Sequence, residues 1–150
     1  MNVTSSVLAF PPPLPEQSAR WLADKLAYYA DAWDVAEDLA RGVDELVVID
    51  ARSGDAYRRG HICGAVSFPH RTMTAESLAG LDRNKIYITY CDGIGCNGST
   101  KAAWKLATAG FQVKELIGGF DFWQRDRHPV VAGDAAGNWP EAAPLPECGC

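Results

Sequence analysis

The chain has 150 residues, of which 47% are hydrophobic and 22% are charged, so we expect one packed domain and exclude global disorder. The net charge of -5 at pH 7 argues against a broad surface for nucleic acid or for an anionic membrane. No apolar run approaches the roughly 20 residues that a membrane span needs, and the first residues lack the basic side chains of a signal peptide. We therefore expect a cytoplasmic protein whose partners are neither nucleic acids nor membranes.

The N-terminal part of the sequence predicts a lead-in followed by two helices. The FPPPLP segment cannot be helical, so residues 1–16 are expected to be extended. Apolar side chains then recur at helical spacing over residues 17–30. A second helix is expected to start near Asp34, which has a glutamate three positions later, and to end near Gly42. We expect both helices, within residues 17–45, to pack on the domain that follows.

The middle of the chain alternates between predicted strands and predicted helices. Four short runs rich in apolar and β-branched residues predict strands: LVVI at 46–49, AVSF at 65–68, IYITY at 86–90 and VKELI at 113–117. Helices are expected at 74–81 and 99–109, each opening on a Thr or Ser cap. This alternation predicts an α/β fold with a mostly parallel sheet. Ala, Gly and Pro dominate the end of the sequence, so residues 132–150 are expected to form a loosely ordered tail.

Cys91 is the strongest candidate for chemistry. It follows the IYITY run at the carboxyl end of a predicted strand, which is where ligands bind in open α/β sheets. The glycine-rich loop after it leads into a helix, and its backbone N–H groups could form an anion nest that lowers the pKa of the thiol from about 8.5 toward 3.5–7.5. A buried thiol, half of a disulfide and a metal ligand are the alternatives. The residues of this expected nest are Asp92, Gly93, Ile94, Gly95, Cys96, Asn97, Gly98 and Ser99.

Four segments, in order, resemble the rhodanese-like sulfurtransferases of the single-domain kind. VVIDARSGDAYRRGHICGAVSFP contains the Asp-x-Arg pair of that family, Asp50 and Arg52, and its Gly-His-Ile-x-Gly-Ala segment. ITYC resembles the strand that delivers the catalytic cysteine, and STKAAWKLATAGFQV resembles the helix after the active-site loop. LIGGFDFW resembles the closing Leu-x-Gly-Gly-x-x-x-Trp signature. The resemblance covers residues 46–131.

This resemblance implies a three-layer fold in which a parallel sheet is flanked by helices, and a reaction through a persulfide on Cys91. The sulfur donor would be thiosulfate or a persulfide, and the acceptor would be a thiol or cyanide. A protein persulfide could serve as donor or acceptor. The resemblance implies no cofactor and no metal. We expect Asp50, Arg52 and His61 to be structural residues near the site.

The loop after Cys91 departs from the family pattern in length and charge. It is two residues longer than the commonest sulfurtransferase loop and contains no Lys or Arg. Phosphatases of the same fold need an Arg six residues after the cysteine, and Asn97 stands there instead, so phosphatase activity is not expected. Arg71, Lys101 and His70 are the candidate cations at the mouth of the site.

Five cysteines cannot all pair within one chain, which leaves room for redox chemistry. Cys96 and Cys63 are candidates to resolve an oxidised or persulfidated Cys91 as a disulfide, and the Cys148-Gly149-Cys150 tail is another. Two further functions therefore stay open. One is a thiol–disulfide or peroxide-reducing enzyme that uses Cys91 and Cys96, and the other is a non-catalytic module that binds a partner protein.

Overall fold

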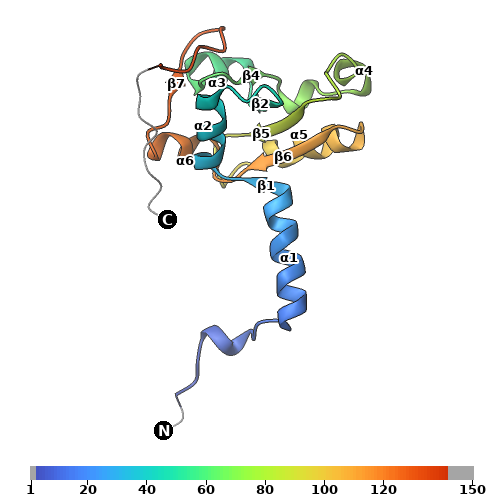
Figure 1. Cartoon of the computed structure of the whole chain (residues 1–150), viewed down its shortest axis with the longest axis vertical. Helices are drawn as coiled ribbons and strands as arrows, with labels where there is room; N and C mark the ends of the chain where they lie inside the picture. Colours follow the sequence, from blue (N-terminus) through green and yellow to red (C-terminus); the bar gives the residue numbers. More distant parts are fainter. Residues whose placement is uncertain (1–2, 142–150) are drawn as a thin grey trace.

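Five parallel strands form the central sheet of the computed structural model, which describes residues 3–141 (Figure 1). In spatial order they are β1 (Tyr29–Ala30), β6 (Gln112–Leu116), β5 (Ile86–Tyr90), β2 (Leu46–Asp50) and β4 (Val66–Ser67). The register pairs Leu46 with Ile86 and Asp50 with Tyr90, so the carboxyl ends of β2 and β5 lie side by side. The predicted α/β fold with a mostly parallel sheet is confirmed.

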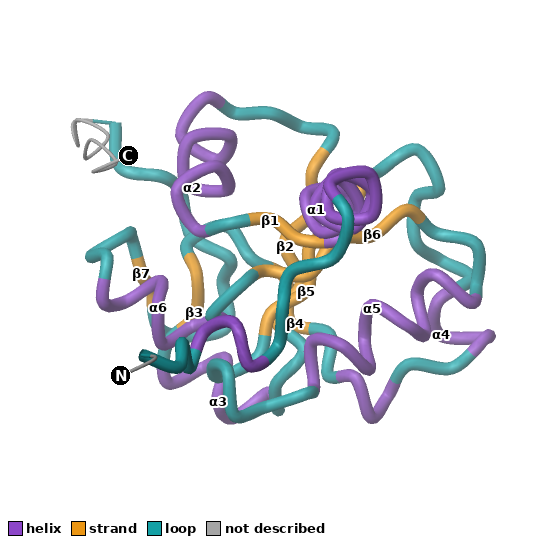
Figure 2. The backbone as a smooth tube through the Cα atoms, turned by 90° about the horizontal axis from the view of Figure 1, so that it is seen from below, coloured by secondary structure: helices purple, strands orange, loops and turns teal. Residues whose placement is uncertain are grey.

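Helices cover both faces of this sheet, and Figure 2 shows α2 and α5 on opposite sides of the central strands. The helices of the domain are α2 (Ala32–Arg41), α3 (Gly54–Arg59), α4 (Ala75–Leu78), α5 (Gly98–Thr108) and α6 (Gly119–Arg125), with a 3-10 turn η2 (His70–Thr72). Successive strand residues point to opposite faces. Val48 therefore joins a core with residues of α2 and α6, whereas Ile49 joins a second core with residues of α4 and α5. Two cores around one sheet make three layers.

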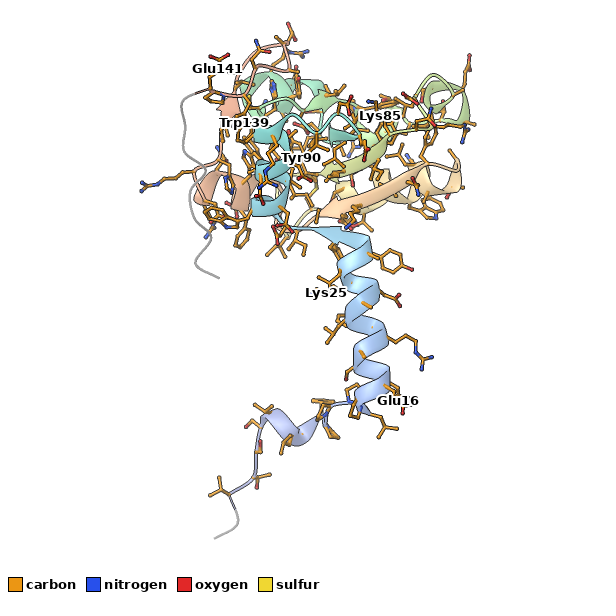
Figure 3. All side chains as sticks on the ribbon, viewed as in Figure 1. Glu16, Lys25, Lys85, Tyr90, Trp139 and Glu141 are labelled. Carbon is orange, nitrogen blue, oxygen red and sulfur yellow. A yellow bond between two sulfur atoms is a disulfide. The ribbon has the colours of Figure 1, made fainter. Side chains whose placement is uncertain are left out.

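The helix α1 (Pro15–Tyr28) has no buried residue and extends away from the domain, in contrast to the expected packing (Figure 1). It follows the 3-10 turn η1 (Val7–Ala9), and it begins at Pro15 because a proline is tolerated in the first helical turn. The first turns of α1, which contain Glu16, stand clear of the domain that contains Tyr90 (Figure 3). The last turns meet the domain, because Lys25 and Leu26 line a pocket together with residues of α2 and β6. Within the part of the chain that the structure describes, no helix is long and apolar enough to cross a membrane.

The second helix starts at Ala32, two residues before the predicted start near Asp34. Asp31 is the N-cap, because its extended backbone lets its side chain accept a hydrogen bond from the Asp34 amide at 2.8 Å. Gly42 closes α2 in the left-handed conformation. Unlike α1, α2 buries residues, namely Ala32, Val35 and Ala36.

The chain after β7 (Val130–Val131), which pairs antiparallel with β3 (His61–Ile62), is more ordered than the sequence predicts. The amide of Gly64 donates to the carbonyl of Ala136 at 2.7 Å. Trp139 packs on the core, with its ring 6.4 Å from that of Trp123. The tail prediction fails there because apolar and backbone contacts hold the segment to the domain. Cys148 and Cys150 lie outside the described residues.

Candidate active site

Cys91 lies at the carboxyl end of β5 and is bonded to Cys96 in a disulfide. The two Cα atoms are 6.2 Å apart. Only 4% of Cys91 is exposed, whereas Cys96 is half-buried. The strand and the loop after it therefore bring together two cysteines five residues apart in the sequence.

The loop amides do not surround Cys91 Sγ in this disulfide form. Among the described residues, no backbone amide donates to Cys91 Sγ, while the amide of Gly98 donates to Cys96 Sγ at 3.4 Å. The helix α5 begins at Gly98 after Asn97, which makes no side-chain cap. Ser99 is consequently not the cap that its type and position predicted. Ser99 is the second residue of α5, and its hydroxyl donates to Glu115 Oε1 at 2.7 Å. This hydrogen bond connects α5 to β6.

Three side chains converge on Gly98. A Cβ atom built at this glycine would lie 2.9 Å from Cys91 Sγ, 3.2 Å from His70 Cδ2 and 3.4 Å from Cys96 Sγ. These distances are shorter than ordinary van der Waals contacts, so a side chain at this position would displace a sulfur atom or the imidazole. Glycine at the start of α5 is what allows the cysteine pair and His70 to meet.

His70 is surrounded by positive charge. Burial lowers its pKa, and so do the charges of Lys105, Lys101 and Arg71, in that order. Lys105 also donates to the carbonyl oxygen of His70 at 2.6 Å, and Arg71 and Lys101 are exposed. Two of the cations proposed from the sequence, Arg71 and Lys101, thus belong to one basic group around His70, and Lys105 is a member that the sequence reasoning missed. His70, whose lowered pKa disfavours the predicted positive charge, is the residue that lies close to Gly98 and the cysteine pair.

A buried network joins the ends of β2 and β5. The carboxylate of Asp50 accepts from Arg52 Nε at 3.0 Å, from Arg52 Nη2 at 2.7 Å and from the Tyr90 hydroxyl at 2.7 Å. Arg52 also donates to Gly60 O at 2.7 Å and to Asp92 Oδ1 at 3.3 Å. Burial alone would lower the pKa of Arg52, but the hydrogen bonds and charge of Asp50 outweigh it and raise that pKa. The network fixes the residue that follows Cys91.

His61 is the first residue of β3, which forms a separate two-stranded sheet with β7, and Cys63 follows that strand. The ring nitrogens of His61 are 2.8 Å from the carbonyl oxygen of Tyr57 and 3.0 Å from that of Ala135, and the ring stacks on Tyr57. Cys63 is a buried free thiol, and burial raises its pKa. A thiol in this state is a poor nucleophile, and the partner of Cys91 is Cys96 rather than Cys63.

The start of α6 holds the backbone of the active-site loop, which the sequence reasoning missed. The amide of Phe120 donates to the carbonyl of Cys91 at 2.9 Å, and the amide of Asp121 donates to that of Asp92 at 2.8 Å. Gly118 and Gly119 both have positive φ angles, which turn the chain into this contact. The Gly-Gly pair after β6 was the available signal, although it predicted only the end of a strand.

A surface depression of about 630 Å³ lies beside this loop and reaches Cys96. Its lining includes Asp92, Ile94, Cys96, Asp121, Phe122 and Arg125. Within residues 3–141, no three His, Cys, Asp or Glu side chains gather in a way that could hold a metal ion.

Comparisons with known proteins identify the family of this chain. The model of the rhodanese-like domain matches residues 34–126, so the chain belongs to the rhodanese-like domain family. It is 33% identical over 117 residues to the HTH-type transcriptional regulator Rv0324 of Mycobacterium tuberculosis, covering 77% of this chain and 51% of the regulator. The chain thus spans about half the length of that regulator.

Two further relatives support the same fold. Thiosulfate sulfurtransferase 16, chloroplastic, of Arabidopsis thaliana is 30% identical over 94 residues, covering 56% of this chain and 78% of that protein. The crystal structure of the BH2092 protein from Bacillus halodurans superposes with a TM-score of 0.76 at 37% identity, covering 86% of this chain and 91% of the other. The domain therefore has a sulfurtransferase-type fold.

Proposed function

We propose that the protein is a sulfurtransferase that carries sulfane sulfur as a persulfide on Cys91. The observation that carries this proposal is the position of Cys91, at the carboxyl end of β5 and against the first residue of α5. The positive end of a helix favours an anionic sulfur, and we expect the loop amides to turn toward the thiolate once the disulfide is reduced. A named sulfurtransferase among the relatives supports the same reading.

In the first half of the reaction, the Cys91 thiolate attacks the outer sulfur of the donor. The S–S bond of the donor breaks, and its remainder leaves as an anion, which is sulfite when the donor is thiosulfate. In the second half, an acceptor thiolate or cyanide takes the outer sulfur of the persulfide and Cys91 leaves as a thiolate. A thiolate with a lowered pKa is the better leaving group in this step.

The cations around His70, namely Arg71, Lys101 and Lys105, support an anionic donor. The loop itself contains no Lys or Arg, so these neighbours are the local source of positive charge. Thiosulfate and the anion of a small or protein-bound persulfide both fit this charge. A cytoplasmic location suits the reaction, because a reducing compartment returns the Cys91–Cys96 disulfide to thiols.

Turnover of thiosulfate and cyanide to sulfite and thiocyanate tests the assignment. After reduction, Cys91→Ser should lose at least about 10³-fold in turnover, because serine cannot form a persulfide. Cys63→Ala is the matched control and should keep turnover near the wild-type value, since Cys63 is a buried thiol outside the disulfide. Wild-type turnover in Cys91→Ser would overturn the proposal.

The pairing of Cys91 with Cys96 favours one second candidate, a thiol–disulfide exchange enzyme. Such an enzyme would cycle between the dithiol and the disulfide without carrying an additional sulfur atom. Treatment of the reduced protein with a sulfur donor separates the two functions, because only the sulfurtransferase gains sulfur on Cys91.

A further inference from the structure

We propose that Cys96 resolves the Cys91 persulfide, so that the protein reduces sulfane sulfur to hydrosulfide at the expense of a dithiol. This inference rests on the proposed function, since it needs a persulfide on Cys91. The pairing of Cys91 and Cys96 supports it, because Cys96 Sγ lies within bonding reach of the sulfur that would carry the persulfide.

The loop between the two cysteines is held at several points. The Cys96 amide donates to the carbonyl of Gly93 at 3.1 Å, which forms a tight turn. Asp92 is fixed from two sides, by Arg52 at 3.3 Å and by the Asp121 amide at 2.8 Å. These contacts hold Cys96 close to Cys91. The attack of Cys96 on the Cys91 persulfide therefore needs no large movement of the chain.

The resolving step balances in atoms and electrons. The Cys96 thiolate attacks Cys91 Sγ, the inner sulfur of the persulfide. The bond between Cys91 Sγ and the outer sulfur breaks, and the outer sulfur leaves as hydrosulfide with the proton from the Cys96 thiol. In this step Cys96 is oxidised and the outer sulfur is reduced, while Cys91 Sγ stays at the oxidation level of a disulfide sulfur. Over sulfur transfer and resolution together, the two cysteine thiols are oxidised to the Cys91–Cys96 disulfide and the sulfane sulfur of the donor is reduced by the same two electrons.

A dithiol is the reductant that completes the cycle. One thiolate of the reductant attacks Cys96 Sγ, forms a mixed disulfide and releases Cys91 as a thiolate. The second thiol of the reductant then closes its own disulfide and frees Cys96. With thiosulfate as donor, the net reaction converts thiosulfate and a dithiol into sulfite, hydrosulfide and a disulfide.

The exposure of the two cysteines determines which sulfur of the disulfide the external reductant attacks. Cys91 is only 4% exposed, whereas Cys96 is half-buried and lines the depression beside the loop. Ile94, which is 78% exposed, and Phe122, which is 38% exposed, flank the same depression. An external thiol therefore reaches Cys96 first. Cys63 cannot replace Cys96 as the resolving cysteine, because Cys63 is buried and burial raises its pKa.

A single-turnover experiment tests the inference. The full chain is reduced, freed of reductant and mixed with one equivalent of thiosulfate, and sulfite, hydrosulfide and the state of Cys91 are followed over time. The wild-type protein should release sulfite, then hydrosulfide, and end with the Cys91–Cys96 disulfide. Cys96→Ser should release sulfite and stop at the persulfide, with hydrosulfide release at least about 100-fold slower because the intramolecular thiol is lost. Cys63→Ala should behave as the wild type does.

The outcomes separate this inference from the proposed function. Sulfite release with a persulfide that persists in the wild type, or equal hydrosulfide release in Cys96→Ser, would overturn the role of Cys96 and leave the sulfurtransferase intact. Failure of both proteins to release sulfite or to gain sulfur from thiosulfate and from a small-molecule persulfide would overturn both proposals. When a dithiol such as dithiothreitol and excess thiosulfate are added, the wild type should release hydrosulfide repeatedly. Under the same conditions, Cys96→Ser should not form the Cys91–Cys96 disulfide.

Discussion

Gly119 has a φ of +61°, and a Cβ atom there would lie 2.5 Å from the carbonyl oxygen of Cys91 and 3.0 Å from the amide nitrogen of Gly93. Both neighbours are backbone atoms that cannot move aside. We predict that Gly119→Ala lowers the free energy of unfolding by about 2–4 kcal/mol, from steric overlap and the left-handed backbone together. Urea denaturation measures this. Gly95→Ala is the control, because that glycine has open space around it, and it should change stability by less than about 0.5 kcal/mol. Equal effects of the two substitutions would contradict the account.

His128 is buried against Trp33 and Trp123, with ring centroids 4.8 and 4.7 Å away, and neither of its ring nitrogens has a hydrogen-bond partner among the described residues. Burial lowers its pKa, so the folded protein holds the imidazole neutral. The unfolded chain takes up a proton near the ordinary pKa of about 6.5. The stability contribution is therefore complete above that pH and is lost as the pH falls from it toward the lower folded pKa.

The prediction for His128 is a pH-dependent melting temperature. The wild-type melting temperature should fall between about pH 7.5 and pH 5.5, and His128→Phe, which keeps an aromatic ring and removes the titration, should fall less. Thermal unfolding followed by circular dichroism at both pH values measures this. His70→Gln is the control for the other histidine with a lowered pKa, which is less buried. The same pH dependence in His128→Phe and the wild type would rule out His128 as the cause.

At the scale of elements, Asp50 joins the end of β2 to β5 and to the segment that contains α3. Asp50→Ala would leave the buried Arg52 guanidinium without its main partner and the Tyr90 hydroxyl without its acceptor. We predict a loss of about 3–5 kcal/mol in the free energy of unfolding, measured by urea denaturation. Asp55→Ala breaks an exposed pair with Arg58 and should cost at most about 1 kcal/mol. A similar small loss for Asp50→Ala would show that the network contributes little.

The elements that are predicted best are those whose position in the fold follows from their own residues. The strands at 46–49 and 86–90 match β2 and β5, because runs rich in β-branched, apolar and aromatic residues are typical of strands buried on both faces of a sheet. The cap at Asp31 was missed because Asp34 offers the same local pattern. The contact of α6 with Cys91 was missed because it depends on where the chain returns after β6.

Some features of the candidate site follow from the local sequence, and others depend on contacts between distant segments. The strand-end position of Cys91 follows from the IYITY run that precedes it. Which cysteine faces Cys91 does not follow from the sequence, because Cys96 and Cys63 are both near it in the expected fold. The basic group around His70 could not be predicted from the sequence either. It forms because η2 and α5, which are far apart in the sequence, pack against each other in the fold.

At the scale of the whole molecule, α1 stands apart from the domain. None of its residues is buried, and Lys114 Nζ donates to the carbonyl of Leu26 at 3.1 Å near its end. We predict that deletion of residues 1–27 changes the free energy of unfolding by less than about 1 kcal/mol, because a single exposed helix of this length is marginally stable in water. Denaturant titration checks this.

The control for that deletion is a longer one, of residues 1–36. It removes β1, which pairs with β6, and the buried residues of α2, so it should cost about 3 kcal/mol or more. Retained sulfur transfer in the shorter deletion would also show that α1 is not part of the active site. Equal destabilisation by the two deletions would contradict the separation of α1 from the domain.

The most direct test of the sulfurtransferase assignment is the mass of the reduced protein after treatment with a sulfur donor, followed by peptide mapping. The account predicts one additional sulfur atom on the peptide that contains Cys91, most readily seen in Cys96→Ser and absent from Cys91→Ser. No additional sulfur from either thiosulfate or a small persulfide, or sulfur found on Cys96 or Cys63 when Cys91 is replaced, would contradict it.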